Sequence, residues 1–219
     1  ILSALAFNTG LPSPEFYIEG IEEINSQDFI YAEDFNFTIK HLAVAKLSTS
    51  GIELRSHPVM LDINSSLAGL KGVRNGIQFD TDLLGAFHVA GSGAGRESTA
   101  SGLISDLHAL SKSNEVSPMN YPDFSNKPNI INFNDLTFKF YVYLEVKDEP
   151  GVLALISKTF ADHNISFDKV IQKDQLQNGS VPVVIFTDPT IESEMQIALQ
   201  DLADHPEVLK SKIIRIEAL

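Results

Sequence analysis

Apolar and polar residues alternate most clearly in the last third of the chain, and the pattern predicts strands and helices in a definite order. Four segments rich in β-branched and aromatic residues are predicted strands: 138–146, 165–173, 181–188 and 209–216. Two helices are predicted between them, at 152–163 and from a Thr190 cap to about Ala203. The resulting order βαββαβ indicates a ferredoxin-like unit.

The turns between these elements carry their own signals. Asp148-Glu-Pro-Gly151 and Gln177-Asn-Gly-Ser180 have the composition of tight turns. Asn164 tolerates the left-handed conformation that often ends a helix, so it is expected to end the helix at 152–163. In that helix, Leu153, Ile156 and Phe160 share one face.

The first half of the chain has a less regular pattern. Its predicted elements are a helix from a Ser26 cap to Asp34, strands at 37–46 and 52–60, a short helix or turn at 64–73, and two strands within 75–91 around a turn at 81–85. Pro58 lacks a backbone N–H, which favours an edge strand or a strand end. Ser98 or Thr99 is expected to cap a helix whose apolar stripe is Ala100, Leu103, Ile104, Leu107 and Leu110.

A stretch rich in Ser, Asn, Pro and Asp separates the two patterns and is predicted to be a linker at 113–137. The expected fold class is therefore α+β. A mixed-sheet domain at 1–112 precedes a ferredoxin-like domain at 138–219.

Composition narrows the possible functions. The 219 residues are 43% hydrophobic and carry a formal net charge of −13 with no basic stripe, which argues against a nucleic-acid partner. The absence of cysteine fits a cytoplasmic protein, and no apolar run is long enough to span a membrane. The six histidines do not show metal-ligand spacing, so no metal site is predicted. The chain opens ILSALAF without a basic segment, which predicts no signal peptide and suggests a protein that continues upstream.

The stretch AGSGAGRESTA at 90–100 is the first candidate binding site. It matches neither the G-x-G-x-x-G dinucleotide fingerprint nor the P-loop, which requires a lysine before the helix, and a phosphate-cleaving enzyme is therefore disfavoured. Bare backbone amides before a helix can still accept an anionic or electron-rich ligand. On residues alone, a tight turn from strand to helix explains the glycines better.

The turn at 148–151 is the second candidate. In a ferredoxin-like unit it leaves the first amides of the following helix free, which suits the carboxylate of a small amino acid. A Pro-Gly turn that serves only the chain's topology would have the same sequence.

The order of these segments resembles two known protein families. The segments IKHLAVAK (39–46), His57-Pro58, Asn75-Gly-Ile77 and GSGAG (91–95), followed by Thr99-Ala100 and Asp106-Leu107, resemble the C-terminal half of homoserine dehydrogenase. The stretch VKDEPGVLALISKTFADHNISFDKVIQ, within 138–217, resembles an ACT domain. Many relatives of the first family have a Pro-Thr pair where this chain has Arg96-Glu97-Ser98-Thr99, which is expected to loosen the loop slightly.

The resemblance implies a role for each candidate. In the family the glycine loop approaches the nicotinamide end of NAD or NADP, which implies cofactor contacts from Gly93, Ala94, Gly95 and Thr99. The catalytic lysine motif and the Rossmann domain are expected upstream of residue 1, so no catalytic residue is assigned and the chain alone is expected to be inactive. Lys40 and Lys46 do not match the catalytic position.

The resemblance to ACT domains implies an amino-acid effector, with threonine favoured. The effector is expected at Asp148, Gly151, Val152 and Leu153. The same families imply a homo-oligomer, either a dimer or a tetramer. The alternative function is a stand-alone regulatory module that binds an amino acid and has no catalysis of its own.

Overall fold

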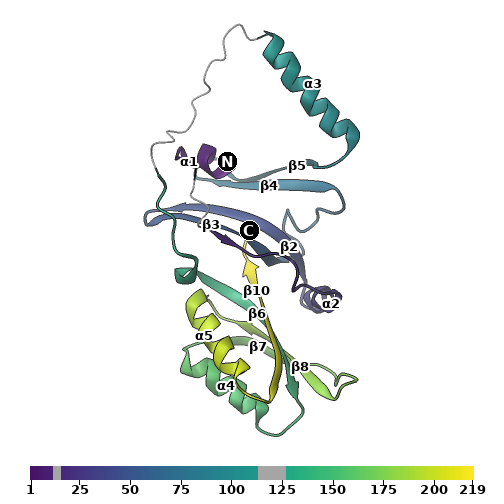
Figure 1. Cartoon of the computed structure of the whole chain (residues 1–219), viewed down its shortest axis with the longest axis vertical. Helices are drawn as coiled ribbons and strands as arrows, with labels where there is room; N and C mark the ends of the chain where they lie inside the picture. The colour runs from purple at the N-terminus through teal and green to yellow at the C-terminus, as the bar shows by residue number, and fades with distance from the viewer. Residues whose placement is uncertain (12–15, 113–126) are drawn as a thin grey trace.

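The computed structural model describes residues 1–11, 16–112 and 127–219, and most of their strands belong to one continuous sheet. Its strands follow the order β1 (Tyr17–Ile18), β3 (Gly51–Asp62), β10 (Val208–Glu217), β6 (Thr137–Lys147), β8 (Ser180–Thr187) and β7 (Phe167–Gln172), and β2 (Phe37–Ser48) pairs with β3. The α+β class predicted from the sequence is confirmed. The molecule is elongated, and in Figure 1 the N-terminus lies in its upper half and the C-terminus near its middle.

The C-terminal part has the predicted ferredoxin-like order. Strands β6, β7, β8 and β10 pair antiparallel, with α4 (Val152–Asp162) after β6 and α5 (Glu192–Ala203) after β8. A short strand β9 (Thr190–Ile191) pairs with the start of β6. Asn164 has φ 57°, so the predicted left-handed end of the first helix is confirmed.

Strand β3 lies at the centre of the first half. Along one edge it pairs antiparallel with the whole of β2. Its other edge meets three segments in turn: Ile130, then β1 at residues 55–56, then β10 in parallel at residues 59–61. The prediction that Pro58 marks an edge or a strand end is wrong. Pro58 falls where the partner changes from β1 to β10, so no strand on that edge needs its missing N–H.

The sheet of the C-terminal part buries both of its faces. Helices α4 and α5 cover one face through Ile156, Phe160, Met195 and Leu202. The opposite face receives α2 (Ser26–Asp34) of the first half, whose Tyr31 and Ala32 join a core that also contains side chains of five strands: Ile39, Met60, Tyr141, Tyr143, Val184, Phe186 and Ile214. Figure 1 shows α2 and the pair α4 and α5 on opposite sides of these strands. The two predicted domains therefore share a core.

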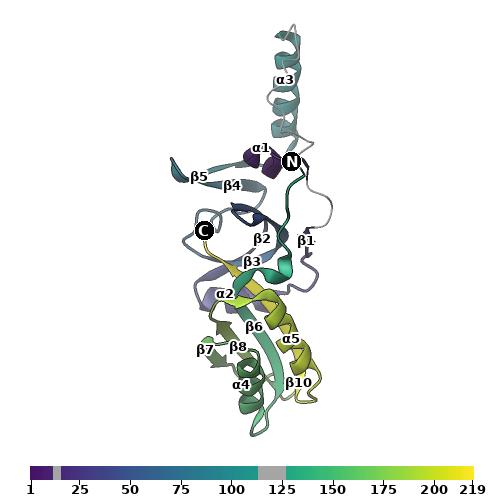
Figure 2. The same ribbon diagram turned by 90° about the vertical axis from the view of Figure 1, so that its left-hand side faces the viewer.

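A separate two-stranded sheet lies above β2 and β3 in Figure 1 and is formed by β4 (Arg74–Thr81) and β5 (Gly85–Ser92). The preceding segment 63–73 forms turns, and its Leu67 and Ala68 pack on Val59 and Leu61 of β3. Helix α3 (Arg96–Lys112) follows β5 and projects from the rest of the molecule (Figure 2).

The described residues of the predicted linker, 127–137, contact the first half of the chain. Ile130 bridges to Ile52, and η1 (Phe133–Asp135) brings Phe133 parallel to the ring of Tyr17 at 3.6 Å between centroids. Residues 113–126 of the predicted linker lie outside the described residues. At the other end, Leu2–Phe7 form the short helix α1.

Two helix caps differ from those predicted. Helix α2 is capped by Asn25, whose Oδ1 accepts from the backbone N–H groups of Gln27 and Asp28, while Asp28 accepts from the N–H of Asn25 at 2.7 Å. Ser26 is thus the first helical residue, because the amide oxygen one position earlier closes a capping box. Thr190 does not cap α5: its hydroxyl donates to the Asp188 carbonyl at 3.0 Å, and the cap position is Ile191.

Asp28 also holds the two halves together, and this contact can be tested by mutation. Lys212 of β10 donates to Asp28 at 2.6 Å, and both side chains are buried. We expect Lys212→Met to lower the free energy of unfolding by about 3–5 kcal/mol, because it leaves the Asp28 carboxylate buried without its cation. Asp34→Asn removes the more exposed pair of Asp34 with Lys173 and is expected to cost at most about 1 kcal/mol. Urea unfolding measures both, and equal effects would contradict the expectation.

Candidate functional site

The glycine loop joins β5 to α3, and its glycines differ in how far the geometry requires them. The N–H of Gly93 donates to the Val73 carbonyl at 2.9 Å, and a Cβ at position 93 would lie 1.9 Å from Nδ2 of Asn75. Gly95 has φ 130°, a conformation that other residues rarely adopt. Gly91 is different, because a Cβ there would meet nothing within 4 Å.

Helix α3 begins at Arg96, two residues before Ser98 and three before Thr99, the predicted caps. The hydroxyls of Ser98 and Thr99 donate to the Gly95 carbonyl at 3.0 and 2.9 Å, so the prediction that either residue caps the helix is wrong. The positive φ of Gly95 turns the chain directly into the helix, and the Thr99 N–H makes the first helical bond to Gly95 at 3.1 Å. The N–H groups of residues 96–98 lack partners within the helix and form a positively polarised end beside Arg96.

The loop and helix are exposed from Gly91 to Lys112. The predicted apolar stripe is present, but Leu103, Ile104, Leu107 and Leu110 are each 58–65% exposed. The hairpin below carries further exposed apolar side chains, among them Leu83 and Val89. Within the described residues, therefore, the glycine loop presents bare backbone that no other segment covers.

The second candidate site lies between β6 and α4. Gly151 has φ 96° and occupies the cap position of α4 without any side-chain cap, and Asp148, Glu149 and Pro150 are exposed. The first amides of α4 are consequently left without helical or side-chain partners, as the sequence predicts. Val152 is buried in the core and its N–H donates to the Glu149 carbonyl at 3.4 Å, whereas Leu153 is 43% exposed and can offer both its N–H and its side chain to a ligand.

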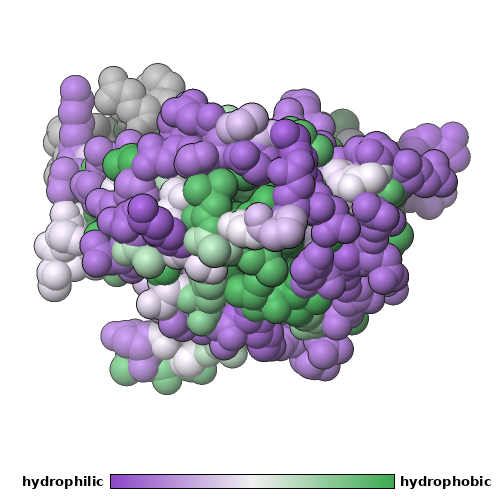
Figure 3. Space-filling model, turned by 90° about the horizontal axis from the view of Figure 1, so that it is seen from below, coloured by the Kyte–Doolittle hydropathy of each residue, from purple (hydrophilic) through white to green (hydrophobic). Residues whose placement is uncertain are grey.

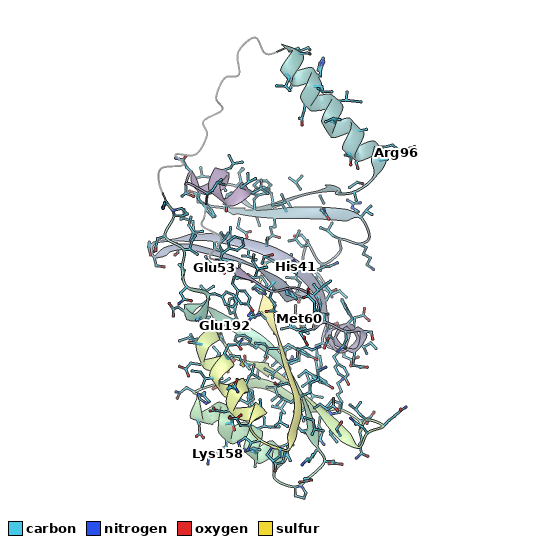
Figure 4. The ribbon with its side chains drawn as sticks, viewed as in Figure 1. His41, Glu53, Met60, Arg96, Lys158 and Glu192 are labelled. Atoms are coloured by element: carbon cyan, nitrogen blue, oxygen red, sulfur yellow. The ribbon has the colours of Figure 1, made fainter. Side chains whose placement is uncertain are left out.

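The structure does not bring the two candidate sites together. Figure 4 shows Arg96, at the start of α3, near the upper end of the molecule, and Lys158 of α4 near the lower end. Residues 93–99 and residues 148–153 are therefore two separate candidate sites.

Two hollows exist elsewhere on the described residues. A groove of about 840 Å³ is lined by segments next to η1, including Leu11, Tyr17, Lys127 and Phe133. A smaller one of about 370 Å³ lies between α4 and α5, where Nε2 of His163 is 2.7 Å from Asp201. Neither is lined by the predicted site residues. No group of three His, Asp or Glu side chains in the described ranges is placed to hold a metal ion.

Buried charges concentrate where β10 meets β3, and sequence reasoning missed them. Arg215 of β10 donates to Glu192 at 2.6 and 2.8 Å and to Glu19 at 2.7 Å. Arg55 of β3 pairs with Glu217 of β10, and Lys46 reaches the same carboxylate at 2.6 Å. Figure 4 shows Glu192 at the end of α5 nearest the first half. The sequence does contain a signal of buried charges, because Arg215 and Glu217 interrupt the apolar run IIRIEAL at positions that a sheet buries.

These charges affect the ionisation of their neighbours. Burial alone would lower the pKa of Arg215, but the Glu192 carboxylate raises it, and the net direction is upward. Burial lowers the pKa of His57 to about 4, and the nearby Arg215 and Arg55 act in the same direction. Neutral His57 lies 2.9 Å from both Arg55 and the Pro58 carbonyl. Because arginine can only donate, Nε2 of His57 accepts from Arg55 and Nδ1–H donates to Pro58.

Comparison with known protein families agrees with this arrangement. The homoserine dehydrogenase family model matches residues 1–108, and the ACT domain model matches residues 140–207. No helix in the described ranges is long and apolar enough to cross a membrane.

Individual relatives match nearly the whole chain. A homoserine dehydrogenase of Helicobacter pylori is 34% identical over 99% of this chain and 52% of that protein. One of Neisseria gonorrhoeae is 32% identical over 91% of this chain and 47% of its own length. The crystal structure of a homoserine dehydrogenase from Thiobacillus denitrificans superposes with a TM-score of 0.85 at 31% identity, covering 99% of this chain and 51% of that one. The chain thus spans about half the length of the relatives it matches.

The buried state of His57 predicts a specific pH dependence of stability. The folded pKa of about 4 lies below the ordinary value of 6.5, so between these values the unfolded chain binds more protons than the folded one. His57 therefore lowers the free energy of unfolding by up to about 3 kcal/mol as pH falls from 6.5 to 4. We expect His57→Gln to have a shallower decline across this window in urea unfolding. Parallel curves for the two proteins would contradict it.

Proposed function

Because this chain belongs to the homoserine dehydrogenase family, we propose that it is part of an NAD(P)-dependent enzyme that interconverts L-homoserine and L-aspartate 4-semialdehyde. The observation that carries this proposal is the backbone match over 99% of the chain to a homoserine dehydrogenase structure. On this proposal, residues 1–112 belong to the substrate and dimerisation domain and residues 138–219 form the regulatory ACT domain.

The residues of the glycine loop suit an approach to the nicotinamide end of the cofactor. Bound NAD or NADP supplies the carbon that gives or accepts the hydride. The chain's own contribution is positional: the turn at Gly93 and Gly95 presents backbone atoms, and the free amides at the start of α3 favour electron-rich groups. Ala94 lies between these glycines, and the Thr99 hydroxyl is held on the Gly95 carbonyl.

The contacts of Lys40 and Lys46 are those of structural rather than catalytic residues. Lys40 donates to the Leu70 carbonyl at 2.5 Å, and Lys46 pairs with Glu217. Both contacts fix β2 to its neighbours. The catalytic lysine is therefore proposed to lie outside residues 1–219, and the chain alone is proposed to be inactive.

The exposed stripe of α3 and the β4–β5 hairpin are proposed to contact the cofactor-binding part of the enzyme. Four large apolar side chains on one helix face, each more than half exposed, favour burial against a partner surface. Such a contact would also cover the neighbouring glycine loop and exclude water from the cofactor.

The ACT region is proposed to bind a small amino acid, with threonine favoured. The uncapped amides of α4 suit its carboxylate, and the Asp148 carboxylate suits its ammonium group. Figure 3, viewed from the ACT end, shows hydrophobic side chains gathered in the middle of a polar face. Exposed apolar side chains of the ACT region include Leu153, Val170 and Leu209. We propose that the enzyme is a cytoplasmic dimer or tetramer and that such surfaces contribute to its assembly.

The cofactor contact can be tested at Gly95 in the full-length enzyme. We expect Gly95→Ala to raise the KM for NAD(P) about tenfold, because a methyl group strains a backbone with φ 130° by about 1–3 kcal/mol and moves the loop. Gly91→Ala is the matched control, since its Cβ would meet nothing within 4 Å. Steady-state kinetics with varied cofactor measures both variants. An unchanged KM in Gly95→Ala would sink the assignment.

The effector site can be tested on residues 1–219. We expect threonine to raise the unfolding temperature, because a ligand at 100 times its Kd stabilises the folded state by about 2.7 kcal/mol. Asp148→Asn should abolish this shift, whereas Glu149→Gln, one residue away on the same exposed turn, should keep it. Thermal unfolding with and without threonine measures the effect. If both variants keep the shift, the ligand does not use this turn.

A further inference from the structure

Strand β10 is the last strand of the described chain, yet it completes structures in both regions. Its residues 208–216 pair with β6 of the ACT region, and its residues 215–217 pair in parallel with residues 59–61 of β3. We call the paired segments 59–61 and 215–217 the seam. β10 therefore lies between the two regions as an interior strand, with hydrogen-bonded neighbours on both edges.

Side chains on both faces of β10 reach across the seam. On one face, Ile214 joins Met60 and Tyr31 in a shared apolar core, and Lys212 pairs with Asp28 of α2. On the other face, Arg215 contacts Glu19, and Glu217 pairs with Arg55. Glu217 is 5% exposed and takes both of its cations, Arg55 and Lys46, from the opposite region, so its neutralisation depends on the seam. Arg55 and Arg215 each also have a carboxylate in their own region, Glu53 and Glu192.

We infer that β10 makes the ACT region and the preceding region one cooperative unit, with the Arg55–Glu217 pair securing the seam. Unfolding the ACT region alone would expose the Tyr31 and Met60 side of the shared core and remove a neighbour of β3. A change in stability anywhere in the ACT region is therefore felt equally at β3, which carries the hairpin and the glycine loop beyond it. This inference goes beyond the proposed function, and it holds whether or not the ACT region binds an amino acid.

Hydrogen exchange on residues 1–219 tests this directly. Ile156→Val removes one methylene group from the core beneath α4, on the sheet face opposite the core of Tyr31 and Met60. Such a change speeds exchange through global unfolding roughly two- to tenfold. We expect amides of β3, in peptides from 51–62, to accelerate by the same factor as those of α4 and β8. Leu107→Ala, on the exposed face of α3, is the matched control and should change neither set.

Two outcomes would overturn the cooperative unit. One is faster exchange in the ACT region of Ile156→Val with β3 unchanged. The other is separate unfolding transitions of the two peptide sets in the unaltered chain. Loss of threonine binding would leave the inference standing, whereas either outcome above would leave the proposed enzyme standing.

The role of the buried pair needs a second comparison. Glu217→Gln keeps the shape of the side chain and removes its charge, and Arg55 retains Glu53 at 2.7 Å. In the Glu217→Gln background, we expect Ile156→Val to speed amide exchange clearly less in β3 than in the ACT region. The matched background is Asp34→Asn, which weakens a more exposed contact between the same regions. In that background, Ile156→Val should still speed exchange in β3 and in the ACT region by the same factor. Equal acceleration of exchange in β3 and in the ACT region of Glu217→Gln would refute the role of the Arg55–Glu217 pair.

Discussion

Much of this structure depends on the need to neutralise the charges that β10 buries. Arg215 and Glu217 lie between apolar neighbours in a strand that has sheet partners on both edges, and an unpaired charge in such a place costs several kcal/mol. Their partners are Glu19 just after β1, Lys46 of β2, Arg55 of β3 and Glu192 at the start of α5. Hydrophobic burial would allow β10 to lie against β3 in more than one register. The charge pairs favour the one in which Arg55 meets Glu217 and Arg215 meets Glu19.

The two candidate sites lie on either side of this charged seam. Toward one end, β3 supports the segment that packs Leu67 on Val59 and leads to the β4–β5 hairpin and the glycine loop. Toward the other, β6 leads into the uncapped start of α4. A stable middle and exposed ends suit a protein in which ligands act at both ends and the sheet between them stays intact.

The local parts of this arrangement could be predicted from the sequence, and the non-local parts could not. The βαββαβ order and the β4–β5 hairpin follow from alternation and turn residues, and the structure confirms both. The caps were missed because only the full geometry decides between neighbouring positions. At α2, Asn25 takes the amides in place of Ser26, whereas α5 follows Ile191 without a side-chain cap and α3 begins directly after Gly95. The parallel pairing of β3 with β10 joins residues more than 150 positions apart. No local pattern encodes it, and for that reason Pro58 looked like an edge residue.

The seam and α3 differ in how much of their apolar surface the described residues bury. At the seam, every charge has a partner and Tyr31, Met60 and Ile214 are buried. On α3, the sequence places Leu103, Ile104, Leu107 and Leu110 on one face, and the described residues leave that face exposed. Evolution seldom keeps such a stripe in water, since burying each side chain is worth about 1.5–3 kcal/mol. The ACT region is thus built into the fold of its neighbour, whereas α3 has an apolar face suited to contact with a further surface.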